Sequence, residues 1–320
     1  MAYNLNSITQ VAKLYYYEHM LQRDIAEKLN ITQVAVARML KAARNKGIVR
    51  VFIADPTLNA SPLKQALMAQ YSLKNAVIAK LNTNNLQLKH INIAKASSTF
   101  LSRTLKNGDI VGLGWGEAVT NMVMQLSGAK PNAKLHKVTV VPVIGGIHEN
   151  IVKYDVNELV RITAEILECS GKKLYAPAVV ENQLVRDALM SDRSISQICD
   201  LWSNLNVLVI GIGNMVAPIP TTITRYLETK PIHYKKLDIK SDICGIHFNS
   251  KGVYVPTQIN DSLIAINYDQ LKQTPHVIAI ACGDEKIQAM SSALKNGFIH
   301  TLISDEETVV KLLEYETLFT

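Results

Sequence analysis

Short apolar runs that alternate with stretches of helical spacing limit the fold of this chain most strongly. Five runs read as buried strands, at residues 76–79, 110–113, 138–144, 207–212 and 277–281. Apolar residues recur at helical intervals between them, over 91–105, 118–126, 156–169 and 286–294. Strands that alternate with helices are typical of a parallel sheet, because each parallel connection needs a crossover. The sequence therefore predicts an α/β, doubly wound fold for most of the chain.

The N-terminal segment has a different pattern, with three helical stretches and a tight turn. The stretches cover 8–17, 22–29 and the residues from Thr32, a capping residue, to Gly47. Asn30 tolerates the left-handed backbone that a tight turn requires. We expect the third helix to bury Val34, Val36, Met39, Leu40 and Ala43. This arrangement predicts a helix-turn-helix, and the β-branched run at 48–53 predicts a wing strand behind it.

The positive charge of the chain is concentrated in the same segment. Residues 1–54 contain eight Lys and Arg against three acidic residues, a net charge of +5 of the total of +7. Such an excess favours a polyanion partner, although solvated basic residues on an ordinary three-helix unit would have the same composition. Gln33 and Arg38 can donate hydrogen bonds to base edges, and Lys41 and Arg44 are better placed for phosphates. We also assign Gln22, Arg23 and Thr32 to the DNA-binding surface.

Glycine turns follow four of the apolar runs. They lie at 112–116, 145–146, 211–213 and 283. The carboxyl ends of parallel strands share one edge, where backbone N–H groups and helix N-termini can bind an anion. Turn chemistry alone would also place glycine there. The turn at Gly211 and Gly213 is not a dinucleotide fingerprint, because Val216 replaces the third glycine. We therefore predict an anion site and no nucleotide cofactor.

Other classes of protein are disfavoured by what the sequence lacks. It has no run of eighteen apolar residues and no basic region leading into an apolar core at its N-terminus. Its four cysteines form no Cys-x-x-Cys pair, and its histidines are dispersed. We expect a cytoplasmic protein with reduced thiols, no membrane span, no metal and no catalytic residues.

Long segments of the sequence also match the pattern of a known family. The N-terminal segment is "VAKLYYYEHMLQRDIAEKLNITQVAVARMLKAARNKGIVRVFI", and later ones include "IVGLGWGEAV", "VVPVIGGI" and "AIACGDEKIQAMSSALKNGFIHTLISDEETVVKLL". The chain thereby resembles, over nearly its whole length, the SorC-type sugar-responsive transcriptional regulators, relatives of the deoxyribonucleoside regulators. This resemblance implies a DNA-binding domain at 1–54, a linker at 55–60, and a sugar-phosphate-isomerase-like effector domain at 61–320. It also implies a homodimer or homotetramer that binds double-stranded operator DNA and responds to a phosphorylated sugar or polyol.

The same resemblance implies a set of effector-binding residues: Gly114, Glu117, Gly146, Gly213, Asn214, Met215, Asp242, Cys244 and Lys286. Lys286 would contact the phosphate, and Asp242 would accept hydrogen bonds from the sugar hydroxyls. The alternatives without a binding role are a surface lysine for Lys286 and a loop carboxylate for Asp242. Cys244 would offer apolar contact.

This chain also departs from the family pattern. Glu117, Ala118 and Ser262 replace the usual effector-domain residues, Leu21 replaces the threonine cap of the second helix, and Gln33 replaces an arginine. These departures suggest a different effector or pose and a different operator. The alternative function is a sugar-phosphate isomerase or hydrolase with an N-terminal nucleic-acid-binding module.

Overall fold

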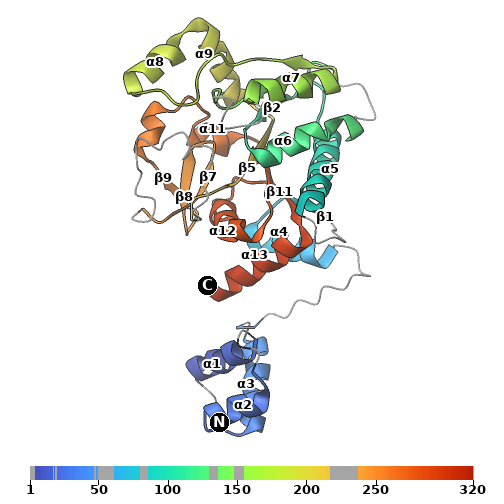
Figure 1. The fold of residues 1–320 in the computed structure, drawn as a ribbon, viewed down its shortest axis with the longest axis vertical. Coiled ribbons are helices and arrows are strands. Elements are labelled where there is room, and N and C mark those ends of the chain that lie inside the picture. The colour runs from blue at the N-terminus through green and yellow to red at the C-terminus, as the bar shows by residue number, and fades with distance from the viewer. Residues whose placement is uncertain are drawn as a thin grey trace. The chain divides into compact units, whose positions relative to one another are not determined.

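A computed structural model describes residues 4–16, 18, 20–46, 48–49, 61–79, 86–129, 136–147, 155–216 and 237–319. The chain divides into two compact units (Figure 1). The smaller unit comprises residues 1–58 with 314–320, and the larger comprises 59–313. None of the helices within the described ranges is long and apolar enough to cross a membrane.

The smaller unit is built on three helices: α1 (Leu5–Tyr16), α2 (Gln22–Lys28) and α3 (Gln33–Asn45). They enclose a core of Ile8, Val11, Ala12, Leu14, Ile25, Ala26, Val36, Met39, Leu40 and Ala43. The expectation that Val34 belongs to this core is wrong, since 61% of Val34 is exposed. The reason is helical geometry: a residue two positions before Val36 lies about 200° away around the helix, on the opposite face.

The turn between α2 and α3 has the predicted geometry. Asn30 has a φ of 50°, in the left-handed region. The Thr32 hydroxyl accepts a hydrogen bond from the Ala35 N–H at 3.1 Å and so caps α3. Leu21 stands at the N-cap of α2 and supplies no side-chain cap. For the predicted wing at 48–53, Ile48 and Val49 are not in a strand, and residues 50–53 lie outside the described ranges.

The larger unit contains a seven-stranded sheet in the order β1-β11-β10-β5-β2-β3-β4, and every neighbouring pair is parallel. Its strands are β1 (Asn75–Ala79), β2 (Ile110–Leu113), β3 (Thr139–Pro142), β4 (Ser170–Gly171), β5 (Val207–Gly211), β10 (His276–Ile280) and β11 (Thr301–Asp305). The five predicted strands and the α/β class are confirmed. β11 was not predicted, because only Leu302 and Ile303 of its five residues are aliphatic.

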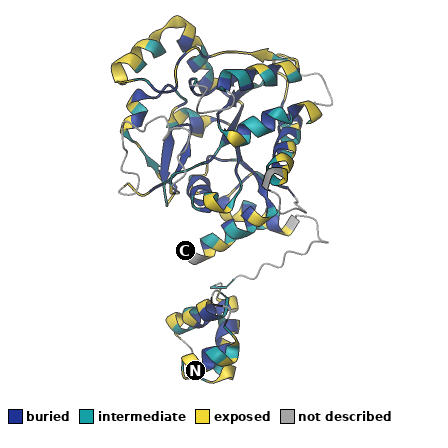
Figure 2. Ribbon diagram, in the orientation of Figure 1, coloured by how far each residue is buried: buried dark blue, intermediate teal, exposed yellow. Residues whose placement is uncertain are grey.

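The helices that follow α3 are α4 (Ser61–Tyr71), α5 (Leu86–Thr104), α6 (Glu117–Met124), α7 (Val156–Leu167), α8 (Gln183–Ser191), α9 (Arg193–Cys199), α11 (Tyr268–Gln273), α12 (Ile287–Lys295) and α13 (Glu306–Phe319). α4 to α7 pack on the parallel sheet, whereas α12 packs on the antiparallel sheet described below (Figure 1). Short 3-10 turns are η1 (Leu126–Ala129), η2 (Asp200–Asn204), η3 (Gln258–Ser262) and η4 (Asp284–Lys286). Apolar side chains of α5, α6 and α7 pack in one cluster with alternate residues of β2, β5 and β10, so these helices cover the same face. The strands between the layers are buried (Figure 2).

A second, antiparallel sheet follows directly from the end of β5. Its order is β6 (Gly213–Asn214), β7 (Ile239–Ile243), β8 (Ile246–Asn249) and β9 (Tyr254–Val255). Cys244 and Gly245 form the two-residue turn between β7 and β8, with φ values of 52° and 83°. Two consecutive positive φ values are typical of a tight hairpin turn, and they explain the glycine. The alternative that Asp242 is a loop carboxylate is therefore wrong, because Asp242 lies on β7.

Candidate functional site

The four glycine turns lie along one edge of the parallel sheet. They follow β3, β2, β5 and β10, which are consecutive neighbours in the sheet order. Adjacent strands are about 4.8 Å apart, so successive turns are close in space. Glycine adds no side chain of its own to these turns, although the N–H groups of Gly114, Gly146 and Gly283 are already hydrogen-bonded within the protein. The edge is the place where open α/β sheets bind small molecules.

Four of the predicted effector residues form one cluster at this edge. A Cβ atom on Gly114 would lie 3.1 Å from the Cys244 sulfur, and one on Gly213 would lie 3.2 Å from the Cβ of Asp242. Gly213 also pairs with Asp242 across the antiparallel sheet. The β7–β8 hairpin thus places Asp242 and Cys244 against the glycine turns of β2 and β5.

The turn after β10 joins this cluster through Asn214. The Asn214 amide donates a hydrogen bond to the Glu285 carbonyl, and the Met215 N–H donates to the Lys240 carbonyl at 3.0 Å. Lys286 ends η4 and is the N-cap of α12, so the helix begins one residue later than expected. A Cβ on Gly283 would lie 2.6 Å from the Glu285 carboxylate oxygens. A carboxylate therefore stands next to the position proposed for a phosphate.

Gly146 and Glu117 have different surroundings. The Gly146 N–H donates to the Ala176 carbonyl at 2.8 Å, and its own carbonyl accepts from the Ala178 N–H at 2.8 Å. These bonds attach Gly146 to a neighbouring segment. Glu117 is the first residue of α6; its side chain is 77% exposed and lies 3.5 Å from His90 Nδ1. An exposed pair of this kind contributes little to stability, so Glu117 remains available to a ligand.

Asp242 belongs to a buried polar group that the sequence did not indicate. Its Oδ1 accepts the Gly245 N–H at 2.9 Å and lies 3.5 Å from Nε2 of His247, its cross-strand partner. Nδ1 of His247 is 3.1 Å from the Thr257 hydroxyl. Burial raises the pKa of Asp242 to about 7 and lowers the pKa of His247 to about 4. Both shifts favour the neutral side chains.

Burial raises the pKa of all four cysteine thiols, which disfavours the reactive thiolate form. All four are free thiols. Burial raises the pKa of Cys199 to about 12 and raises the pKa of Cys244 further, so both are protonated at neutral pH. Within the described ranges, no group of three His, Cys, Asp or Glu side chains is close enough to hold a metal ion.

The second candidate site is the exposed face of α3. Gln33, Arg38, Lys41 and Arg44 are exposed there, and this helix contains no acidic residue. Val34 lies on the same face and was missed as a candidate, because its apolar character indicated a core position. Of the remaining candidates, Thr32 caps α3, Gln22 is half-buried in α2, and Arg23 is exposed in a 2.9 Å ion pair with Asp24.

These two sites define a class of protein. A helix-turn-helix whose third helix has a cationic exposed face, joined in one chain to a parallel sheet with glycine turns at its carboxyl edge, is typical of ligand-responsive DNA-binding regulators. The family model described as "Putative sugar-binding domain" matches residues 55–314. The chain belongs to this family.

Relatives along the full length are named transcriptional regulators. The chain is 28% identical to the sorbitol operon regulator of Klebsiella pneumoniae, over 97% of this chain and 98% of that protein. It is 27% identical to the deoxyribonucleoside regulator of Bacillus subtilis, over 95% of this chain and 96% of that protein. The crystal structure of the full-length K. pneumoniae regulator SorC superposes with a TM-score of 0.72, covering 98% of this chain and all of that chain at 27% identity. The resemblance to SorC-type regulators is therefore confirmed.

Proposed function

We propose that the protein is a transcriptional regulator that binds operator DNA of a carbohydrate-utilisation operon and responds to a phosphorylated sugar or polyol. The exposed face of α3 carries the proposal, because it combines cations, an amide and a small apolar side chain without any carboxylate. The names of the full-length relatives support a regulator that does not turn over its ligand. We further propose that it acts in the cytoplasm as a homodimer or homotetramer.

The proposed division of the chain is a DNA-binding domain at 1–54, a linker at 55–60 and an effector domain at 61–320. The family match that begins at residue 55 supports this division. In the DNA-binding domain, α3 enters a major groove that is about 12 Å wide. Arg38 and Gln33 read base edges, Lys41 and Arg44 contact phosphates, and Val34 packs on a thymine methyl group.

Paired variants test the DNA-binding assignment. Arg38→Ala is expected to weaken binding to an operator selected from random DNA by about 10- to 100-fold, because it removes a bidentate base contact. Lys41→Ala is the matched control on the same face, and it should weaken specific and non-specific DNA alike while lowering the salt slope by about one unit. Fluorescence anisotropy on both DNAs measures the two effects. If Arg38→Ala also weakens both DNAs equally, Arg38 binds phosphate.

The glycine-lined edge supports an effector with both an anionic and a hydroxylated part. The N-terminus of α6 and the Lys286 ammonium suit a phosphate. The Glu117 and Glu285 carboxylates suit hydroxyl groups, because they only accept hydrogen bonds. Asp242, neutral at mildly acidic pH, stands behind the glycines and can donate as well as accept. Phosphorylated sugars and polyols carry both parts.

A lysine variant tests the effector site. A sugar phosphate that binds the native state raises the melting temperature of the wild-type protein by mass action. We expect Lys286→Ala to lose this shift and to keep operator affinity. Lys272→Ala, in the last turn of α11, is the matched control and should retain the shift. Scanning fluorimetry with a panel of sugar phosphates gives the result, and a shift that survives in Lys286→Ala would place the site elsewhere.

A further inference from the structure

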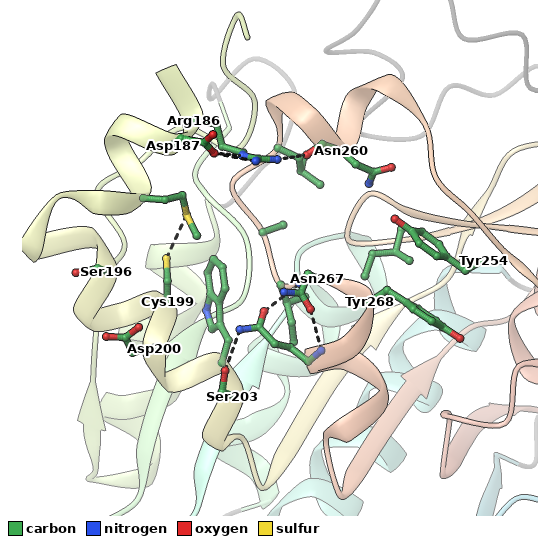
Figure 3. A pocket seen from close by; sticks show the side chains of 17 residues that line it. Arg186, Asp187, Ser196, Cys199, Asp200, Ser203, Tyr254, Asn260, Asn267 and Tyr268 are labelled. Carbon is green, nitrogen blue, oxygen red and sulfur yellow. Dashed lines mark hydrogen bonds and ion pairs between the residues drawn. The ribbon is translucent and has the colours of Figure 1, made fainter. Parts of the chain in front are cut away.

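A cavity of about 400 Å³ forms a second candidate site for a small molecule (Figure 3). It opens between α8, α9 and η2 on one side and η3, α11 and β9 on the other. The nine predicted effector residues are absent from its lining. Its volume is in the range of small-molecule sites. α8 forms its outer wall, and none of the nine residues of this helix is buried.

The floor of the cavity is rigid and apolar. Trp202 and Ile266 are each 1% exposed, and Ile246 is 2% exposed. The indole N–H of Trp202 donates to the Pro142 carbonyl at 2.8 Å, which fixes the ring against the end of β3. Tyr254 and Tyr268 stack on one side of the cavity, with ring centroids 4.6 Å apart and planes 13° apart. The apolar and aromatic walls are therefore formed without a ligand.

The polar side chains of the cavity are held in place by one another. Gln270 donates to the Ser203 hydroxyl at 3.0 Å, and Asn267 accepts the Gln270 N–H at 2.9 Å in a reciprocal cap. The Ser203 hydroxyl still has its own proton to donate, and the Tyr254 hydroxyl can both donate and accept. Amides and hydroxyls that are fixed beforehand bind a polar ligand with little further loss of entropy.

Charge in the cavity disfavours an anion. Arg186 is paired with Asp187 at 2.7 Å, and its Nη1 donates to the Asn260 carbonyl at 2.8 Å. The Asp200 carboxylate adds a negative charge that this pair does not balance. A phosphate would meet net repulsion here, whereas it is suited to the Lys286 turn.

We propose that this cavity binds an unphosphorylated sugar or polyol, at a second site distinct from the one for the phosphorylated effector. Hydroxyl groups of such a ligand match the amide and hydroxyl groups of Ser203, Asn267 and Gln270. Its C–H surface packs on the tyrosine pair and the apolar floor. The proposal goes beyond the proposed function, which does not depend on it.

The cavity is connected to the glycine-lined edge through Asn260. Its backbone carbonyl accepts from Arg186 in the cavity wall, and its side-chain amide donates to the Gly245 carbonyl at 3.0 Å. The Gly245 N–H in turn donates to Asp242. A ligand that shifts Arg186 or η3 therefore acts on the hairpin that holds Asp242.

Calorimetric titration of the full-length protein tests the proposal, with D-glucose, D-fructose, D-galactose and D-glucitol as probes. We expect at least one probe to bind saturably. Ser203→Leu, which fills the cavity, and Tyr254→Leu, which removes half of the aromatic pair, should each weaken that binding by at least about ten-fold. Tyr254→Phe keeps the aromatic ring and should lose less affinity for the probe than Tyr254→Leu. This comparison separates loss of ligand contact from a folding defect.

Lys286→Ala is the matched control and should bind the neutral probe as the wild type does. Glucose 6-phosphate should not displace that probe. Three results would overturn the proposal: no saturable binding of any of the four probes, equal binding by Ser203→Leu, or loss of neutral-probe binding in Lys286→Ala. Each of these leaves the sugar-phosphate test at the glycine-lined edge unaffected, so the two proposals fail separately.

Discussion

At the scale of single residues, burial changes which of two side chains carries a proton near pH 5: His247 in the unfolded chain and Asp242 in the folded protein. In the unfolded chain near pH 5, Asp242 is ionised and His247 is protonated, because their ordinary pKa values are 3.8 and 6.5. In the folded protein the pKa of Asp242 is about 7 and that of His247 about 4, so the proton resides on Asp242. The Asp242 contribution to stability is lost as pH rises from about 4 to 7, and the His247 contribution is lost as pH falls from 6.5 to about 4. Between about pH 4 and 6.5, the two groups therefore change the free energy of unfolding in opposite directions as the pH changes.

In an Asp242→Asn variant, the pH dependence of the free energy of unfolding from this pair should come from His247 alone. The variant keeps a neutral side chain of the same shape, so its free energy of unfolding should fall by on the order of 1–2 kcal/mol more than that of the wild type between pH 7 and pH 5. Urea unfolding of the larger unit at the two pH values measures this difference. Parallel changes in the two proteins would show that the proton does not move as inferred.

Sequence reasoning could locate Asp242 but not its partner. The glycine turns at this edge were predictable because apolar runs that end in glycine mark the carboxyl ends of parallel strands, whereas Asp242 and Cys244 were expected only from the family resemblance. His247 was not, because its contact with Asp242 depends on a hairpin whose strands mix Lys240, Ser241 and Asp242 with apolar residues. The cavity was not predictable either, since its walls come from segments between about 186 and 270 that only the tertiary fold brings together.

At the scale of elements, the periodicity of a helix is more informative than the polarity of one residue. In α3, buried positions recur at intervals of three and four from Val36 to Ala43, and the opposite face carries the cations together with Val34. The helix boundaries in the smaller unit agree with the sequence to within a few residues. The apparent misfit, an exposed valine, is the residue that adds an apolar contact to the proposed DNA-reading face.

The N-terminus of α2 lacks a cap and can be improved. Leu21 has φ −67° and ψ 148°, the extended conformation of a capping residue, but its side chain cannot accept a hydrogen bond. Leu21→Ser should therefore stabilise the smaller unit by about 1 kcal/mol, because the serine hydroxyl can accept a free N–H of the first turn. Leu21→Ala is the control and should give no gain. Thermal unfolding followed by circular dichroism measures both, and equal melting temperatures would contradict the capping argument.

At the scale of the whole molecule, the proposed oligomer has a consequence for the operator. A two-fold dimer would place two α3 helices about 34 Å apart, or a multiple of that distance, on one side of the duplex. The operator should then be a palindrome. Inserting about five base pairs between its halves turns one half-site to the far side and should weaken binding by at least about ten-fold, whereas inserting about ten base pairs should weaken it less. Gel-shift titrations distinguish these cases, and equal affinities for both insertions would indicate independent monomers.

Asn260 gives the larger unit a physical link between the cavity and the glycine-lined edge. Its one carbonyl and one amide join the wall around Arg186 to the hairpin that holds Asp242. If a ligand in the cavity changes the affinity for the ligand at the glycine-lined edge by some factor, the ligand at the edge must change the affinity for the cavity ligand by the same factor. If the two proposed ligands are coupled in this way, the affinity of the protein for each depends on the concentration of the other.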